Sequence, residues 1–265
     1  MDSVADLWPV FGLFIQTPRL RLRLPREEEL GELAGAARVI ARAGEPELHL
    51  PWMYGSSPGM ERQFLQRYWR ALAHWKPESW HLPLAIYLDG RPIGVQDLWA
   101  NDFARVRSVG TASWITRGEQ GHGYGTEARA AVLELAFGQL GAAEACTEYL
   151  EGNYGSEKVS RKLGYTDNGQ HRVYRDDTGG TTEYRLRLDR HDLADNDCSR
   201  VLRSVPVTGN NTPPGALSQM GRLSRIRARN RLARVLPSYS TFSARMFDCG
   251  RSIWRCGRRR MSCRT

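Results

Sequence analysis

Long hydrophobic runs are absent from this chain. The longest apolar stretch, residues 7–15, is nine residues long and contains Pro9, whereas a membrane-spanning helix needs about 20 apolar residues. The first residues, Met-Asp-Ser-Val-Ala-Asp, are acidic and lack the basic segment that opens a signal peptide. We therefore expect no membrane span and a cytoplasmic location.

Cysteine is also scarce. The chain has five cysteines, an odd number, of which Cys146 is the one before residue 194. None of them forms a Cys-x-x-Cys pair or has the Cys/His spacing of a zinc site. The sequence therefore predicts neither a disulfide scaffold nor a bound metal.

Lysine is nearly missing, and the basic residues are unevenly distributed. The chain has 3 lysines against 35 arginines, and its net charge is +9. Residues 1–193 carry a net charge of −3, whereas residues 194–265 carry 15 arginines, no lysine and a net charge of +12. This shift predicts a domain over residues 1–193 and an Arg-rich C-terminal extension over 194–265. We expect the extension, which opens with a linker-like stretch over 195–214, to be largely disordered.

Hydrophobic periodicity in the first 193 residues predicts short strands alternating with helices. Residues 84–88 and 92–98 flank an Asp-Gly turn and predict a β-hairpin. The clearest helix is residues 126–140, with one apolar face and Gly141 as a stop signal. Further strands are expected at 19–24, 108–116, 145–150, 171–175 and 181–188, and further helices at 26–42, 59–75 and 153–163. This alternation indicates an α/β or α+β fold.

A glycine-rich turn joins the strand at 108–116 to the helix at 126–140. It reads Gln120-Gly-His-Gly-Tyr-Gly125 and leads directly into Thr126. Glycine lets the backbone approach a ligand closely, and the following helix adds free N–H groups and the positive end of its dipole. The Lys-Ser/Thr of a P-loop is absent, and residue 126 is not the third glycine of a dinucleotide site. The turn therefore predicts a different kind of phosphate site.

The residues of this turn match the Q/R-x-x-G-x-G/A signature of the GNAT acyltransferases. About 30 residues later, Asn153, Ser156 and Lys162-Leu-Gly-Tyr165 resemble the N-x-x-S…K-L-G-F/Y segment of the RimJ/RimL-type branch. Thr17-Pro-Arg-Leu-Arg-Leu22 is similar to the first strand of that branch. The resemblance covers residues 14–190 and none of the extension.

The resemblance implies a GNAT fold, in which a mixed, mostly antiparallel, twisted sheet of about six to seven strands is flanked by helices. The fourth and fifth strands of that sheet separate in a V-shaped opening that admits acyl-CoA. The pantetheine arm would pair with backbone groups near Trp114, Ile115 and Thr116. The residues implied to bind the pyrophosphate and the adjoining arm are Gln120, Gly121, His122, Gly123, Tyr124, Gly125, Thr126, Asn153 and Ser156.

The resemblance also implies two catalytic residues. Ser156 would contact the CoA sulfur and protonate the departing thiolate, although an exposed helix residue would give the same pattern. Glu148 is the candidate general base, with Glu151 and a water relay as alternatives. Asn153 is also an ordinary helix N-cap residue, and the two roles are compatible.

The predicted function is N-acyl transfer from acetyl-CoA, or another acyl-CoA such as succinyl-CoA, to an amine. The acceptor would be a protein N-terminus or a small molecule, and the enzyme could act as a homodimer. The alternative hypothesis is a non-catalytic CoA-binding or nucleic-acid-associated protein on the same scaffold. Contact with nucleic acid would involve the basic extension alone. We favour the view that the extension lies outside the enzyme, because the resemblance ends before it begins.

Overall fold

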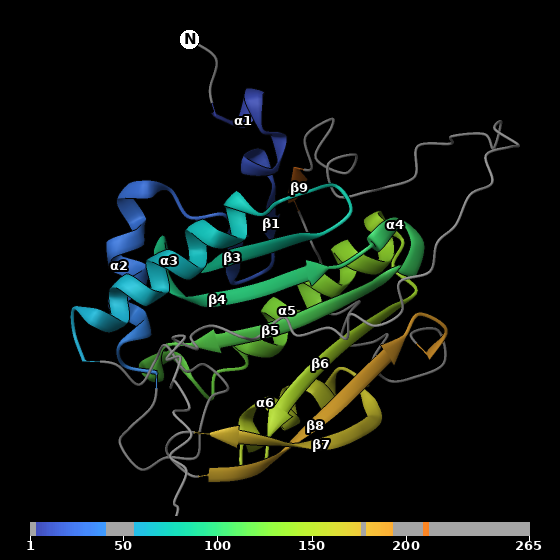
Figure 1. Cartoon of the computed structure of the whole chain (residues 1–265). Coiled ribbons are helices and arrows are strands. Elements are labelled where there is room, and N and C mark those ends of the chain that lie inside the picture. Colours follow the sequence, from blue (N-terminus) through green and yellow to red (C-terminus); the bar gives the residue numbers. More distant parts are fainter. Residues whose placement is uncertain (1–3, 41–55, 176–178, 193–208, 212–265) are drawn as a thin grey trace, which may run out of the picture. The chain divides into compact units, whose positions relative to one another are not determined.

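The computed structural model describes residues 4–40, 56–175, 179–192 and 209–211 (Figure 1). The predicted disorder of the extension lies outside the described residues, apart from 209–211. The helices are α1 (Val4–Leu7), η1 (Pro9–Gly12), η2 (Glu27–Glu29), α2 (Leu30–Ala37), α3 (Gly59–Ala73), α4 (Phe103–Val106), η4 (Arg117–Glu119), α5 (Tyr124–Glu134), η5 (Leu135–Leu140) and α6 (Tyr154–Lys162). The strands are β1 (Phe14–Gln16), β2 (Leu20–Arg23), β3 (Trp80–Leu88), β4 (Arg91–Ala100), β5 (Ser108–Ile115), β6 (Glu144–Leu150), β7 (Thr166–Arg175), β8 (Gly179–Asp189) and β9 (Gly209–Asn211).

The strands form one sheet in the order β7-β8-β6-β5-β4-β3-β2-β1-β9. All paired neighbours are antiparallel except β5 and β6, which are parallel. This confirms the mixed, mostly antiparallel α/β fold, with nine strands among the described residues rather than six to seven. The count is higher because β1 and β9, each three residues long, are too short to show a period. Strand β9 comes from the stretch expected to be a linker.

Local sequence signals predicted the main elements correctly. The hairpin of β3 and β4 turns at Asp89 and Gly90, which have φ angles of 50° and 83°, as an Asp-Gly turn requires. The 126–140 helix is present as α5 followed by the π-helical segment η5, and it ends at Gly141 with φ at 73°. Glycine can adopt this left-handed conformation without the steric penalty of a side chain.

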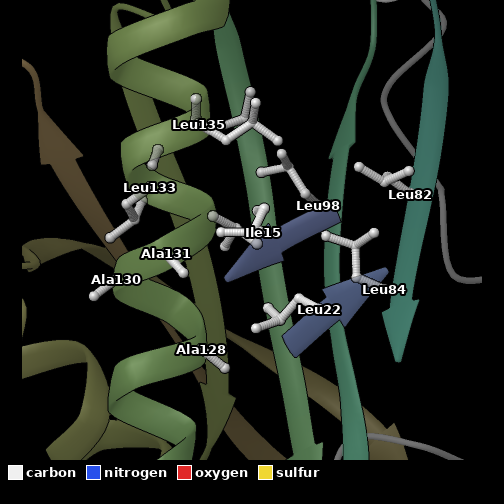
Figure 2. Packing of buried hydrophobic residues seen from close by; sticks show 14 of the residues in the cluster. Ile15, Leu22, Leu82, Leu84, Leu98, Ala128, Ala130, Ala131, Leu133 and Leu135 are labelled. Carbon is white, nitrogen blue, oxygen red and sulfur yellow. The ribbon is translucent and has the colours of Figure 1, made fainter. Parts of the chain in front are cut away.

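Helices cover both faces of the sheet. Helices α2 and α3 lie on one face, and α5 lies on the other (Figure 1). The α5 face packs the main core, to which α5 contributes Ala128 and Ala131 and the strands contribute leucines such as Leu22, Leu84 and Leu98 (Figure 2). The small alanine side chains let the helix lie close to the strands. As a result α5 is held firmly against the sheet, and its first turn is fixed at the end of β5.

No helix among the described residues is both long enough and apolar enough to cross a membrane.

Candidate active site

Strands β5 and β6 separate after a short paired stretch. They pair at Ser108 with Glu144, Val109 with Ala145 and Gly110 with Cys146, and no further along the strands. Both strands nevertheless continue, to Ile115 and to Leu150. This is the predicted V-shaped opening, because the strands expected at 108–116 and 145–150, the fourth and fifth expected from the sequence, are β5 and β6. The separation leaves the edge of β5 that faces β6 open from residue 111 to residue 115.

The open edge of β5 presents backbone groups. Thr147 Oγ1 donates to the carbonyl of Thr111 at 2.9 Å, and Gln120 Nε2 donates to the carbonyl of Ile115 at 2.8 Å. Backbone groups on a strand alternate in direction with a period of two residues. The N–H and C=O of Ser113 therefore point into the opening between these two bonds, where an extended ligand containing amides can pair with them.

The glycine turn lies between the end of β5 and the first turn of α5. Gly121 and Gly123 have φ angles of 82° and 84°, and Gly123 is the N-cap of α5. The first N–H groups of an α-helix have no partner within the helix, so the amides of Tyr124, Gly125 and Thr126 are available to a ligand. Gly121, His122 and Gly123 are exposed. The turn therefore has the geometry of an anion site.

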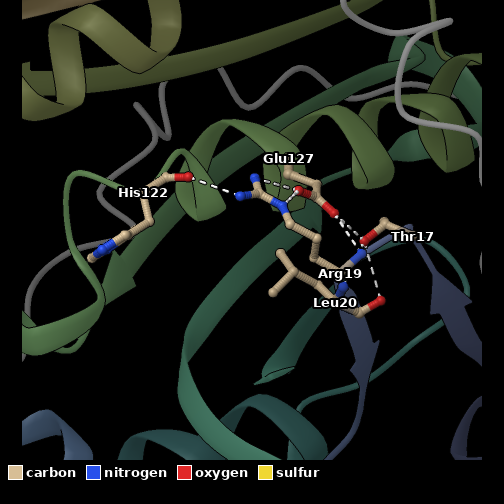
Figure 3. A network of polar contacts seen from close by, with 5 residues as sticks. All are labelled: Thr17, Arg19, Leu20, His122 and Glu127. Carbon is tan, nitrogen blue, oxygen red and sulfur yellow. Dashed lines mark hydrogen bonds and ion pairs between the residues drawn. The ribbon is translucent and has the colours of Figure 1, made fainter. Parts of the chain in front are cut away.

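A polar network fixes the turn to the first strands (Figure 3). The Arg19 guanidinium binds the Glu127 carboxylate at 2.6 Å and donates to the backbone carbonyl of His122 at 3.0 Å. Thr17 Oγ1 and the Arg19 N–H both donate to Glu127 Oε1, at 2.6 and 3.1 Å. Arg19 also lies over the Tyr124 ring, at 4.6 Å from its centre. Residues more than 100 positions apart thus hold the turn in place.

Two of the residues predicted to bind the cofactor have side chains that make structural contacts. Gln120 donates to the carbonyl of Ile40 at 3.1 Å as well as to Ile115. Trp114 is buried against Phe64 and α2 on the sheet face opposite α5. A ligand in the opening would therefore meet the backbone at 113–115 rather than the Trp114 ring.

Helix α6 begins beside the opening. The Ser156 N–H donates to Asn153 Oδ1 at 3.1 Å, which makes Asn153 the N-cap. This confirms the prediction that Asn153 is the N-cap of a helix, and its contact with the pantetheine arm stays a prediction. Ser156 is half-buried in the first turn of the helix, and none of the described contacts involves its hydroxyl group.

Glu148 lies on β6 and is exposed. Its carboxylate pairs with Arg185 of the adjoining strand β8 at 3.2 Å. Glu151, the alternative base, is exposed in the turn that follows β6. The structure thus places both carboxylates near the open end of β6.

Sequence reasoning missed Glu183, a buried carboxyl on β8. It lies opposite Leu150 of β6, on the same sheet face as Glu148, with His171 Nε2 at 3.2 Å. Burial, together with the negative charge of Glu148, raises the pKa of Glu183 to about 7. A single glutamate in an alternating strand gives no sequence signal of such an environment.

Sequence reasoning also missed a polar centre on the face covered by α2 and α3. Asp97 of β4 lies opposite Ala112 of β5 and contacts His81 at 2.6 Å and Arg67 at 3.4 Å. Burial alone would raise the pKa of the Asp97 carboxyl, but His81 and Arg67 outweigh it and hold the pKa below its usual value. Asp97 borders a cavity of about 20 Å³, which is room for one water molecule or one ammonium group.

Trp99 lies over Gly110 at the point where the strands separate. A Cβ added to Gly110 would lie 2.1 Å from the Trp99 ring. Glycine at position 110 therefore leaves room for the Trp99 indole. The indole covers the point where β5 and β6 separate, on the same sheet face as Asp97.

The described residues hold no group of three or more His, Cys, Asp or Glu side chains that is suited to a metal ion. A separate cavity of about 1120 Å³ is lined mainly by residues of η1 to α2, including β1 and β2, and by α3 residues. It does not include the glycine turn.

Comparisons with known proteins agree with this geometry. Residues 19–166 match the family described as "Acetyltransferase (GNAT) domain". The fold is similar to Mycobacterium smegmatis RimJ in complex with CoA-disulfide, with a TM-score of 0.55 at 18% identity over 72% of this chain and 92% of that chain. A GCN5-related N-acetyltransferase from Brucella melitensis has a TM-score of 0.57 at 15% identity, over 79% of this chain and 94% of that one. A spermidine N-acetyltransferase SpeG chimera from Vibrio cholerae and hSSAT has a TM-score of 0.51 at 14% identity, over 67% and 99%.

The family match spans more than half of the chain and includes β2, the separated strands, the glycine turn and α6. The RimJ structure among its neighbours is consistent with the RimJ/RimL-like branch. This chain belongs to the GNAT family of acetyltransferases.

Proposed function

We propose that the protein transfers an acyl group, with acetyl as the default, from acyl-CoA to an amine by direct attack. The observation that carries the proposal is the open edge of β5, which is followed, after the short helix η4, by the glycine turn and the unpaired amides of the first turn of α5. An extended arm with amide groups and a pyrophosphate at its end matches this surface along its length. CoA has that chemistry.

The chain's own residues supply the binding. Amides of residues 121–126 hold the pyrophosphate, and the backbone N–H and C=O of Ser113, together with the N–H of Ile115, pair with the pantetheine arm. Asn153 is positioned next to that arm as the N-cap of α6. Holding both reactants side by side supplies much of the rate enhancement, and a backbone N–H near Ile115 polarises the thioester carbonyl.

We assign proton transfer to residues of β6, β8 and α6. Glu148 is the proposed general base for the attacking amine. Glu183 lies on the same face with a pKa of about 7, and a pKa near the working pH suits a group that exchanges protons. Ser156 is the proposed donor of a proton to the thiolate.

The acceptor is an amine on a small molecule or a protein N-terminus. We propose that it approaches on the sheet face that carries Asp97, because Asp97 borders the cavity of about 20 Å³ on that face, which has room for one ammonium group. Among the solved structures with this fold, the names include a putative ribosomal-protein-serine acetyltransferase from Vibrio cholerae and the spermidine N-acetyltransferase SpeG chimera, which name a protein acceptor and a small-molecule amine. The homodimer, the cytoplasmic location and the separate role of the extension stay predictions.

The test is a measurement of free thiol released from acetyl-CoA, with and without a panel of amines and peptides, combined with calorimetry of CoA binding. Amine-dependent thiol release is expected. CoA binding without turnover of any acceptor would favour the non-catalytic alternative, and no CoA binding would contradict the proposal.

A variant locates the cofactor site. Gly123→Asp puts a carboxylate at the proposed pyrophosphate position, so we expect the Kd for CoA to rise at least about 100-fold through lost charged hydrogen bonds. Its Cβ would lie 3.5 Å from Arg19 Nη2, an ordinary contact. Gly169→Asp is the matched control, because Gly169 has φ of 93° with nothing within 4 Å and lies on β7. Equal affinities in the two variants would refute the assignment.

A further inference from the structure

Arg129 of α5 is a buried arginine that does not belong to the site as described so far. It is 2% exposed. Its Nη1 donates to Ser160 Oγ of α6 and its Nη2 to Ser113 Oγ of β5, both at 2.9 Å. Its Nε is buried with no hydrogen-bond partner. No Asp or Glu within the described ranges forms an ion pair with it.

The protein surrounds this cation with neutral groups. Tyr165 is the titratable side chain that interacts with it, and burial raises the pKa of Tyr165 to about 12 although Arg129 opposes that rise. Tyr165 is therefore protonated at neutral pH and supplies no negative charge. Burial lowers the pKa of Arg129 itself, but an arginine stays charged in proteins.

Such a charge is costly to the folded protein. Burying a cation without an anionic partner costs several kcal/mol, and well-packed apolar residues of similar volume are often neutral or stabilising in its place. The neighbouring positions of α5, including Ala128 and Val132, are apolar and fully buried. Packing therefore gives no reason for an arginine here.

The guanidinium lies at the wall of the opening. Ser113 belongs to the part of β5 that is not paired with β6, and it is half-buried. Ser160 Oγ donates in turn to the backbone carbonyl of Ser156 at 2.9 Å. Two hydrogen bonds thus connect Arg129 to the residue proposed to meet the CoA sulfur.

We propose that Arg129 balances an anionic group that acyl-CoA brings into the opening beside Ser156. The inference rests on the proposed function. It makes Arg129 a positioning residue, which acts through Ser113 and Ser160.

Two sources of that negative charge are compatible with the position. In transfer, the amine nitrogen forms a bond to the thioester carbon, the C–S bond breaks, and its electron pair leaves on sulfur as a thiolate. The amine gives up its proton to the base, and the thiolate later takes one. Alternatively, the acyl group carries a carboxylate of its own, as a succinyl group does.

The experiment compares Arg129→Met and Arg129→Lys with the wild type. Arg161→Met is the control, since Arg161 is an exposed arginine next to Ser160 that pairs with Asp167. The full-length proteins are measured for urea unfolding without ligand, for the thiol pKa of bound CoA by the ultraviolet absorbance of the thiolate, and for turnover of acetyl-CoA and succinyl-CoA.

The methionine variant is expected to unfold at the same or a higher urea concentration than the wild type. If the partner is the thiolate, Arg129→Met should raise the thiol pKa of bound CoA and lower kcat with acetyl-CoA about 10-fold, which is less than the effect of losing a direct oxyanion donor. Arg129→Lys should restore part of both properties. A carboxylate partner predicts that the wild type prefers succinyl-CoA and that the methionine variant loses this preference.

The proposal is overturned if the methionine variant keeps the wild-type thiol pKa and both turnover rates. It is also overturned if that variant unfolds at lower urea while the thiol pKa of bound CoA and the donor preference stay unchanged, because Arg129 would then have a structural role alone. Absence of CoA binding by the wild type would refute the proposed function and this inference together. CoA binding that is sensitive to Gly123→Asp, with an unaffected methionine variant, would refute this inference alone.

Discussion

Removal of Arg19 tests the network that fixes the glycine turn. Arg19→Ala takes away the cation that binds Glu127, whose side chain is 7% exposed, while Arg19 itself is 45% exposed. Breaking a buried pair from one side costs about 3–5 kcal/mol, because the remaining charge loses its partner. Thr17 Oγ1 and the backbone N–H of residue 19 still donate to the carboxylate, so we expect the low end, about 3 kcal/mol.

The loss should be visible as a shift in thermal unfolding. For a domain of this size, 1 kcal/mol corresponds to about 2–4 °C in Tm, so Arg19→Ala should unfold about 6–12 °C below the wild type. Arg91→Ala is the matched control, since its pair with Glu119 is long, at 3.3 Å, and Arg91 is 64% exposed. Exposed pairs contribute at most about 1 kcal/mol, so its Tm should stay close to that of the wild type.

The same variant should weaken cofactor binding. Arg19 donates to the His122 carbonyl and lies over Tyr124, and without it the turn loses both restraints. We expect the Kd for CoA to rise about 10-fold, equivalent to about 1.4 kcal/mol, when measured by calorimetry well below the Tm of the variant. Equal Tm losses in Arg19→Ala and Arg91→Ala would refute the stabilising role of the network. Lower stability with unchanged CoA affinity would show that the turn holds its shape without Arg19.

Three further predictions concern catalysis, pH and the extension. Ser156→Ala should lower kcat by about 10²-fold, the low end for an acid–base residue, with little change in CoA affinity; a wild-type rate would assign Ser156 to packing or solvent. Because the folded protein raises the pKa of Glu183 from 4.5 to about 7, the folded state holds a proton that the unfolded chain releases, and stability falls as pH rises through that window. Between pH 5 and pH 8 the free energy of unfolding of the wild type should fall by up to about 3 kcal/mol through this group, as measured in urea melts, and Glu183→Gln should abolish that fall. Identical pH profiles of stability in the wild type and the variant would refute the buried environment of Glu183. Truncation after residue 193 removes β9 from the edge beside β1 but should keep CoA binding and turnover; loss of either would extend the domain beyond that boundary.

Local signals in the sequence are sufficient to predict several elements of the fold. The Asp-Gly turn, the glycine stop at Gly141 and the N-cap at Asn153 all act within a few residues of the chain, so each could be predicted where it occurs. The glycine turn between a strand and a helix is local too, and its position on the chain predicts where the cofactor binds.

The burial of charged side chains and the partners they contact could not be predicted from the sequence. The sequence does not distinguish Glu127, Arg129 and Glu183 from ordinary surface charges, yet they are all buried. Their partners come from distant parts of the chain: Arg19 for Glu127, Ser160 for Arg129 and His171 for Glu183. The electrostatic role of a side chain depends on its solvent exposure and its neighbours across the sheet, and both exist only once β5 and β6 have separated and α5 has packed beneath them.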